Sequence, residues 1–176
     1  MHIREEILAE HSKAQSMKIA AFACSSPKNF KELMHCFQDP EYRVAQRAAW
    51  SVCHAVQLKP EMIQPYLSML ADQLDRSDVH PAVIRNSIRI LEELEIPEAL
   101  HGKVMNACFR FIETPATPVA IKAFSLTTLH HLSRLYPDIR HELKLLIEDN
   151  WDHETAAFRS RGRKILKDYS AFKSSS

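Results

Sequence analysis

The sequence predicts an all-α fold in which about five helix pairs form one right-handed α-α superhelix, a single domain over residues 1–176. Three observations lead to this fold class. The chain of 176 residues contains only 2 glycines, so hairpins built on Asn-Gly or Asp-Gly turns are absent. Its prolines recur at similar intervals along the chain. A triplet of apolar and small residues recurs with a period typical of stacked helix pairs.

Prolines mark the expected helix starts, because the first helical turn tolerates a residue without an N–H donor. Four of them follow apolar-periodic stretches and begin the first helix of a pair: Pro27, Pro60, Pro97 and Pro137. Three fall between these and begin the second helix: Pro40, Pro81 and Pro118. Asp39 and Thr117 directly precede two of the second set and are expected N-caps. The resulting boundaries are a degenerate pair over 3–26, pairs over 28–60, 61–97, 98–137 and 138–170, and a tail over 171–176.

The second helix of each pair carries an apolar residue, a small residue four positions later and an apolar residue four positions after that. The triplets are Val44, Ala48 and Val52; Val83, Ser87 and Leu91; Ile121, Ser125 and Leu129; and Phe158, Gly162 and Leu166. This spacing places each triplet on one helix face, and a small middle residue lets neighbouring helices approach closely. We therefore expect leucine at the middle positions to destabilise the fold, whereas alanine at Gly162 gains helix propensity if space allows. An ordinary helical bundle with accidental spacing is the alternative interpretation.

Two segments resemble the second helix of a HEAT repeat with its preceding turn: DPEYRVAQRAAWSVCHAVQLKP and TPVAIKAFSLTTLHHLSRLYP. The resemblance to HEAT and armadillo-like repeats extends from about Ile3 to Tyr169. The order of segments up to ELKLLIEDNWDHETAAFRSRGRKILK also resembles a family of small bacterial HEAT-like proteins, some of which carry an adenylosuccinate lyase label. It lacks the Gly- and Ser-rich signature loop of that lyase superfamily and is too short for its helical bundle, so we expect no such activity.

The composition favours a cytoplasmic location. The formal net charge of +1 provides no strong overall attraction to nucleic acid or membranes. The N-terminal segment MHIREEILAEH lacks the apolar core of a secretory signal, and the longest apolar run, Ile19 to Cys24, is far shorter than a membrane span. The 4 cysteines form no CxxC pair, which favours reduced and mostly buried thiols.

No catalytic, cofactor or metal motif emerges, so the chain is expected not to be an enzyme. With glycines only at Gly102 and Gly162, a P-loop, a GxGxxG turn and a GxSxG elbow are impossible. The 10 histidines include the adjacent pair His130 and His131, but neighbours on a helix point about 100° apart and cannot chelate from one face. We expect no catalytic residues, no cofactor and no metal site.

The candidate binding surface is the outer face of the second helices, which lines the concave groove in HEAT-type solenoids. Offsets −1, +2, +3, +6 and +10 from each triplet's first residue lie about 200–300° around the helix from it. These positions are rich in cations and include two aromatic side chains; the expected partner-binding residues are Arg43, Arg47, Trp50, Arg85, Arg89, Phe124, Arg161 and Lys164.

Arginine grips carboxylates bidentately, so the expected partner is a protein or an acidic peptide held by a non-enzymatic scaffold. The alternative partner is nucleic acid on the basic concave face, as in HEAT-type alkylpurine DNA glycosylases. A third interpretation makes the arginines a solvated face and packs the aromatic rings against neighbouring helices.

Overall fold

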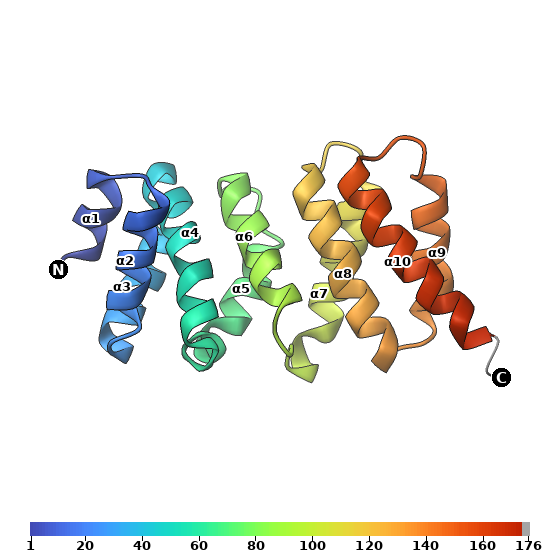
Figure 1. Cartoon of the computed structure of the whole chain (residues 1–176), viewed down its shortest axis with the longest axis horizontal. Helices are drawn as coiled ribbons and strands as arrows, with labels where there is room; N and C mark the ends of the chain where they lie inside the picture. Colours follow the sequence, from blue (N-terminus) through green and yellow to red (C-terminus); the bar gives the residue numbers. More distant parts are fainter. Residues whose placement is uncertain (174–176) are drawn as a thin grey trace. The chain divides into compact units, whose positions relative to one another are not determined.

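The computed structural model describes residues 1–173, and the side chains as far as Ala171. Over these residues the chain is helical and contains no strand (Figure 1). Its elements are α1 (Ile3–Ala9), α2 (Lys13–Ala23), α3 (Pro27–Phe37), α4 (Tyr42–Leu58), the 3-10 helix η1 (Pro60–Tyr66), α5 (Leu67–Gln73), α6 (Pro81–Glu92), α7 (Glu98–Glu113), α8 (Val119–Leu135), α9 (Ile139–Asp149) and α10 (Ala156–Lys173). The predicted fold class, all-α with about five helix pairs, is confirmed. Its right-handed superhelical path stays a prediction.

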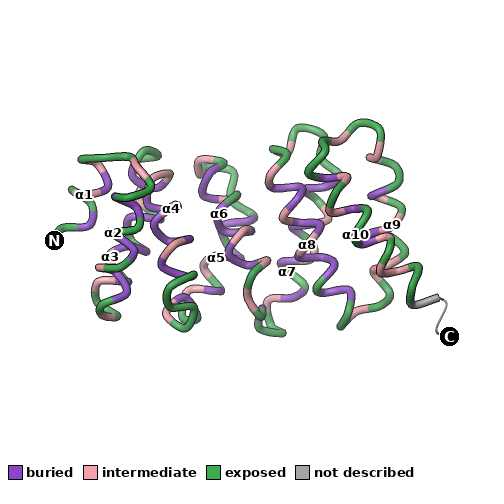
Figure 2. Tube along the Cα trace, viewed as in Figure 1, coloured by how far each residue is buried: buried purple, intermediate pink, exposed green. Residues whose placement is uncertain are grey.

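The chain divides into two compact units, unit 1 over Met1–Ile90 and unit 2 over Leu91–Ser176. In unit 1, α2 and α3 both pack on α4, and α1 contacts all three. The serine hydroxyls of Ser12 and Ser26 cap α2 and α3 by accepting the N–H groups of Gln15 and Asn29. Figure 2 shows buried stretches, in purple, that alternate with exposed ones along these helices. Large fully buried side chains of α1, α2 and α3 in this core are Ile3, Ile7, Ile19, Phe30, Leu33, Met34 and Phe37, and η1, α5 and the residue after α5 add Ile63, Leu67, Leu70 and Leu74.

In unit 2, α8 packs against α7, α9 and α10, and α9 also contacts α10. The core of this unit consists of fully buried apolar side chains from all four helices: Val104, Ile112, Leu126, Leu129, Leu143, Ile147 and Phe158. One charged pair lies within this packing, because Lys122 of α8 donates to the carboxylate of Glu154, and both side chains are at most 10% exposed. Among the described helices none is long and apolar enough to cross a membrane.

Proline marks helix starts as predicted at several places. Pro27 and Pro81 are the first residues of α3 and α6, and Pro97 and Pro118 directly precede α7 and α8. After Pro60, however, the chain first forms η1 and only then α5. The cause is Pro65, which lies inside η1 and has no N–H for an α-helical hydrogen bond.

The two expected N-caps are wrong. The N-cap residues of α4 and α8 are Glu41 and Pro118, and neither helix has a side-chain cap. The Asp39 carboxylate instead accepts the N–H of Glu41 at 2.9 Å and pairs with Arg4 of α1 at 3.1 Å. Asp39 therefore shapes the turn before α4 and ties it to α1.

The predicted triplets do face the core. Eleven of their twelve residues are buried, and the exception, Leu166, is half-buried. At Gly162 the space for a side chain is missing, because a Cβ there would lie 2.9 Å from Cγ2 of Ile147 and 3.3 Å from Cζ3 of Trp151. α10 thus approaches α9 and the following turn closely at this glycine.

Candidate partner-binding surfaces

In unit 1 two of the expected binding residues of α4, Arg47 and Trp50, are half-buried, and the third is exposed. Arg43 is exposed, whereas Trp50 is half-buried between two histidine rings. The centroid of the Trp50 ring lies 5.5 Å from that of His11, in an edge-on arrangement, and 6.0 Å from that of His54. Trp50 therefore presents part of its ring to solvent from a fixed position on the helix.

Arg47 serves the fold of unit 1. Its Nη1 donates to the carbonyl oxygens of Ile7 and Leu8, at 3.1 Å each. These carbonyls belong to the last turn of α1, where no intrahelical N–H partner is available. Arg47 thus closes the end of α1 with a charged donor, which is favourable at a helix C-terminus.

On α6, Arg85 is exposed and Arg89 is half-buried. Asn86, between them, is buried, with its amide donating to the Ala82 carbonyl. Arg89 lies close enough to His54 of α4 to influence its titration. Partial burial lowers the pKa of His54, and the neighbouring positive charges of Lys13 and Arg89 lower it further, whereas a hydrogen bond with Gln57 opposes this shift.

The unit 1 basic surface consists of five cationic or aromatic side chains that stay accessible on α4 and α6: Arg43, Trp50, His54, Arg85 and Arg89. Within it the structure brings Trp50, His54 and Arg89 together. Arg43 and Arg85 remain exposed on the same two helices.

In unit 2 the expected residues Phe124 and Arg161 contact each other. The Arg161 guanidinium carbon lies 5.1 Å from the centroid of the Phe124 ring. Its Nη1 donates to the Glu92 carboxylate and to the Thr127 hydroxyl, at 2.6 Å each, and to the Ala123 carbonyl at 3.2 Å. Burial raises the pKa of Glu92, and the bond from Arg161 opposes that rise.

A cavity of about 550 Å³, called here the His131 cavity, opens beside this cluster. It is lined by Glu92, the last residue of α6, Glu93 after it, Thr127, His130, His131 and Arg134 of α8, and Arg161, Lys164 and Ile165 of α10. Of the expected binding residues, Arg161 and Lys164 line this cavity. Lys164 is exposed and Arg161 half-buried.

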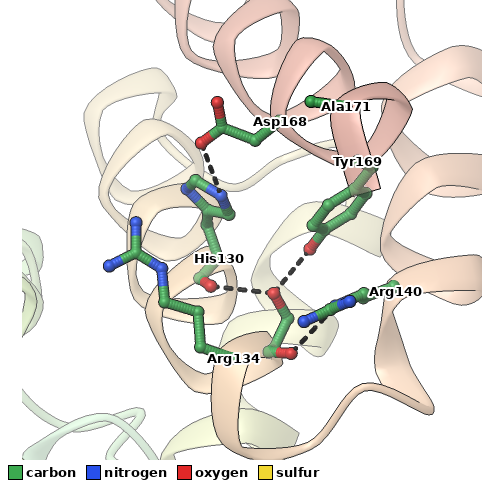
Figure 3. A pocket seen from close by; sticks show the side chains of 7 residues that line it. His130, Arg134, Arg140, Asp168, Tyr169 and Ala171 are labelled. Carbon is green, nitrogen blue, oxygen red and sulfur yellow. Dashed lines mark hydrogen bonds and ion pairs between the residues drawn. The ribbon is translucent and has the colours of Figure 1, made fainter. Parts of the chain in front are cut away.

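A second, smaller cavity of about 280 Å³ shares His130 and Arg134 with the first (Figure 3). It contains the residue types of a nucleophilic triad, Ser133, His130 and Asp168. The hydroxyl of Ser133, however, donates to the backbone carbonyl of His130 at 2.8 Å and accepts from Tyr169 at 2.7 Å. The imidazole Nε2 lies 3.2 Å from Oδ2 of Asp168, and the ring packs edge-on against that of Tyr169. Because the ring does not face the hydroxyl proton, this set is not arranged to activate a nucleophile.

Sequence reasoning missed Arg134 and Arg140, which line these cavities. Arg134 stands 13 residues after Ile121, so it lies about 220° around α8 from it, inside the sector of the expected groove. An offset of +13, about one turn beyond the last offset used, would have included Arg134. Arg140 comes from α9 and donates to the Ser133 carbonyl at 3.1 Å, a contact that no offset on α8 indicates. Among the described residues, no group of three or more His, Cys, Asp or Glu could hold a metal ion.

Comparison with known proteins gives one positive finding. The family model described as HEAT repeat domain matches residues 3–169. No curated protein and no solved structure matches the chain. The matched range covers both units and every helix that contributes to the two surfaces.

Proposed function

Because the chain belongs to the HEAT repeat family, whose repeats commonly mediate protein interactions, we propose that it is a non-enzymatic scaffold for a protein partner. The partner segment is acidic and binds to the outward faces of the second helices. One observation carries this proposal: beside the buried triplets, the same helices keep cations and aromatic rings accessible to solvent.

The unit 1 basic surface fits an acidic peptide by charge and by contact area. Arg43 and Arg85 are exposed and can pair with carboxylates in a bidentate way. Trp50 adds a large apolar surface with few rotatable bonds, and such a residue often dominates a binding interface. With the whole chain at only +1, these cations imply a negative remainder, so the charge is unevenly distributed.

The test uses fluorescence anisotropy with a library of labelled acidic peptides and the full chain. Arg43→Glu combined with Arg85→Glu should weaken the binding of selected peptides at least about tenfold, because two charge-assisted contacts become repulsive. The matched control is Lys28→Glu combined with Lys31→Glu, which makes the same charge change at exposed positions of α3. Circular dichroism should show both variants folded, since exposed charges contribute little to stability.

The outcome against the proposal is equal loss of binding in both double variants. That result would mean that peptides respond only to net charge and that no surface on α4 and α6 selects them. Equal peptide affinity of the wild type and the Arg43/Arg85 double variant would also contradict the proposal.

A fluorescent oligonucleotide in the same assay tests the nucleic-acid alternative. Binding of nucleic acid releases condensed counterions, so its affinity falls steeply with salt and depends little on sequence. An acidic peptide should show a shallower salt dependence, because only a few exposed contacts are screened. Tight, steeply salt-dependent oligonucleotide binding by the wild type would replace the scaffold proposal with the nucleic-acid one.

A further inference from the structure

The His131 cavity contains an arginine that is already held in place. Arg161 makes its three hydrogen bonds through Nη1 alone, to acceptors on α8 and at the end of α6. A guanidinium has five N–H donors, so donors on Nε and Nη2 remain for a ligand. The side chain is 33% exposed and can be reached from solvent. Its geometry is therefore fixed before any ligand arrives, which lowers the entropic cost of binding.

The accessible charge around this arginine is mainly positive. Glu92 is 10% exposed and is engaged by Arg161, so these two charges largely compensate each other. Arg134 and Lys164 line the same cavity from α8 and α10, and both are exposed. Within the described part of the chain neither has an acidic partner within ion-pair distance. Glu93 is the remaining acidic group of the lining, which leaves two accessible cations against one anion.

Two imidazoles add donors that depend on pH. His130 and His131 both line the cavity, with ring centroids 6.3 Å apart in a stacked arrangement. Desolvation lowers the pKa of both rings, and the charges of Arg134 and Lys164 lower both further. For His130 the Asp168 carboxylate opposes this shift, and for His131 a hydrogen bond to the Glu92 backbone does so.

We propose that the His131 cavity binds an oxyanion group, a carboxylate or a phosphate, through Arg161, Lys164 and Arg134, and that protonated His131 strengthens this binding. The site deepens the proposed function, since it rests on the scaffold role for the source of the oxyanion, an acidic or phosphorylated segment of the partner. Oxyanions suit the cavity because arginine and lysine supply only donors and because both imidazoles can donate.

Because anion binding and protonation of His131 are linked, the affinity of the cavity for an anion should depend on pH. The groups that face His131 are Glu92 of α6, Glu93 of the turn after it, His130 and Arg134 of α8, and Arg161 and Lys164 of α10. In the empty cavity the cations disfavour an imidazolium. A bound dianion reverses the sign of the local charge and raises the pKa of His131, so binding takes up a proton. Affinity should therefore increase as the pH falls through the ordinary range of histidine titration, at about 6.5.

The experiment follows the histidine Cε1 proton resonances of the full chain by NMR at constant ionic strength. His130→Gln and His131→Gln assign the two signals. Inorganic phosphate and succinate are added separately, and their relative affinities distinguish a phosphoryl group from a carboxylate. Sulfate serves for the pH dependence, because its own charge stays constant between about pH 5.5 and 7.5. The expected result is a saturable shift of both resonances, with sulfate binding several-fold tighter at about pH 5.5 than at 7.5.

Variants locate the binding. Arg134→Ala combined with Lys164→Ala should weaken binding at least about tenfold, because two of the three cationic donors are removed. The control Lys167→Ala removes an exposed cation from the same helix without touching the cavity lining and should bind as the wild type does. Shifts that do not saturate, or an equal loss in the control, would overturn the proposal. The anion titration needs no partner, so its failure would leave the peptide-binding result on unit 1 valid. Failure of the peptide assay would likewise leave anion binding in the His131 cavity valid.

Discussion

Gly162 offers the sharpest test of the packing, because its substitution sets helix propensity against space. Replacing glycine with alanine inside a helix ordinarily gains up to about 1 kcal/mol. At Gly162 the added Cβ would lie only 2.9 Å from Cγ2 of Ile147. Ile147 is fully buried and β-branched, so its side chain has little freedom to rotate away. Overpacking of this kind typically costs about 1–3 kcal/mol, which exceeds the propensity gain.

The net expectation for Gly162→Ala is a loss of about 1 kcal/mol, or a fall of about 2–4 °C in the melting midpoint for a chain of this size. Gly102 is the matched control. It lies exposed within α7, and a Cβ there would meet nothing within 4 Å. Gly102→Ala should therefore raise the midpoint by a similar amount, since only propensity acts. Thermal melts followed by circular dichroism measure both. A Gly162→Ala midpoint at or above that of the wild type would refute the close approach of α10 to α9.

Two further predictions concern buried charge and pH. Lys122→Met should cost about 3–5 kcal/mol in denaturant unfolding, because it leaves the Glu154 carboxylate buried without its partner, whereas Lys122→Met with Glu154→Leu should recover most of that loss. An unfolding free energy of Lys122→Met equal to that of the wild type would contradict a buried ion pair. The folded-state pKa values of His54, His130 and His131 lie below the ordinary value, so the unfolded chain binds more protons and stability should fall as the pH drops below about 6.5. Urea unfolding at two pH values measures this slope, which should flatten in His130→Asn. An unchanged slope in that variant would contradict a lowered pKa of His130 in the folded chain.

The helix phase could be predicted from sequence because it requires only the angle per residue and a repeated pattern. The middle positions Ala48, Ser87 and Ser125 are fully buried, as the triplets predict. What could not be predicted was the crowding at Gly162, because it depends on Ile147, which lies on the preceding helix. A one-dimensional pattern shows which face is buried but not how much space remains there.

The site was predictable to a smaller extent, because its decisive contacts join residues far apart in sequence. Arg161 bonds to Glu92, 69 positions earlier, and Arg47 bonds to the Ile7 carbonyl, 40 positions earlier. Neither contact leaves a local signal, since charge and spacing within one helix do not reveal which acceptor a neighbouring helix presents. The cavity lining followed the groove sector in part, and Arg134 was missed only because the offsets ended one turn too soon.

Position on the second helix nevertheless separates structural from accessible cations. The +3 offset lies about 300° from the first triplet residue, and thus nearer to the buried sector than offsets −1, +2 and +6, at about 200–260°. All four +3 residues make contacts within their own unit: Arg47 and Asn86 in unit 1, and Phe124 and Arg161 in unit 2. Arg85, at offset +2, is exposed instead. Because Arg47 and Arg161 at +3 donate to acceptors outside their own helices, their loss should lower stability first, whereas loss of a cation at −1, +2 or +6 should lower binding alone. Arginines selected by charge alone therefore include both structural and binding residues. Their angle around the second helix, measured from the first triplet residue, distinguishes the two roles.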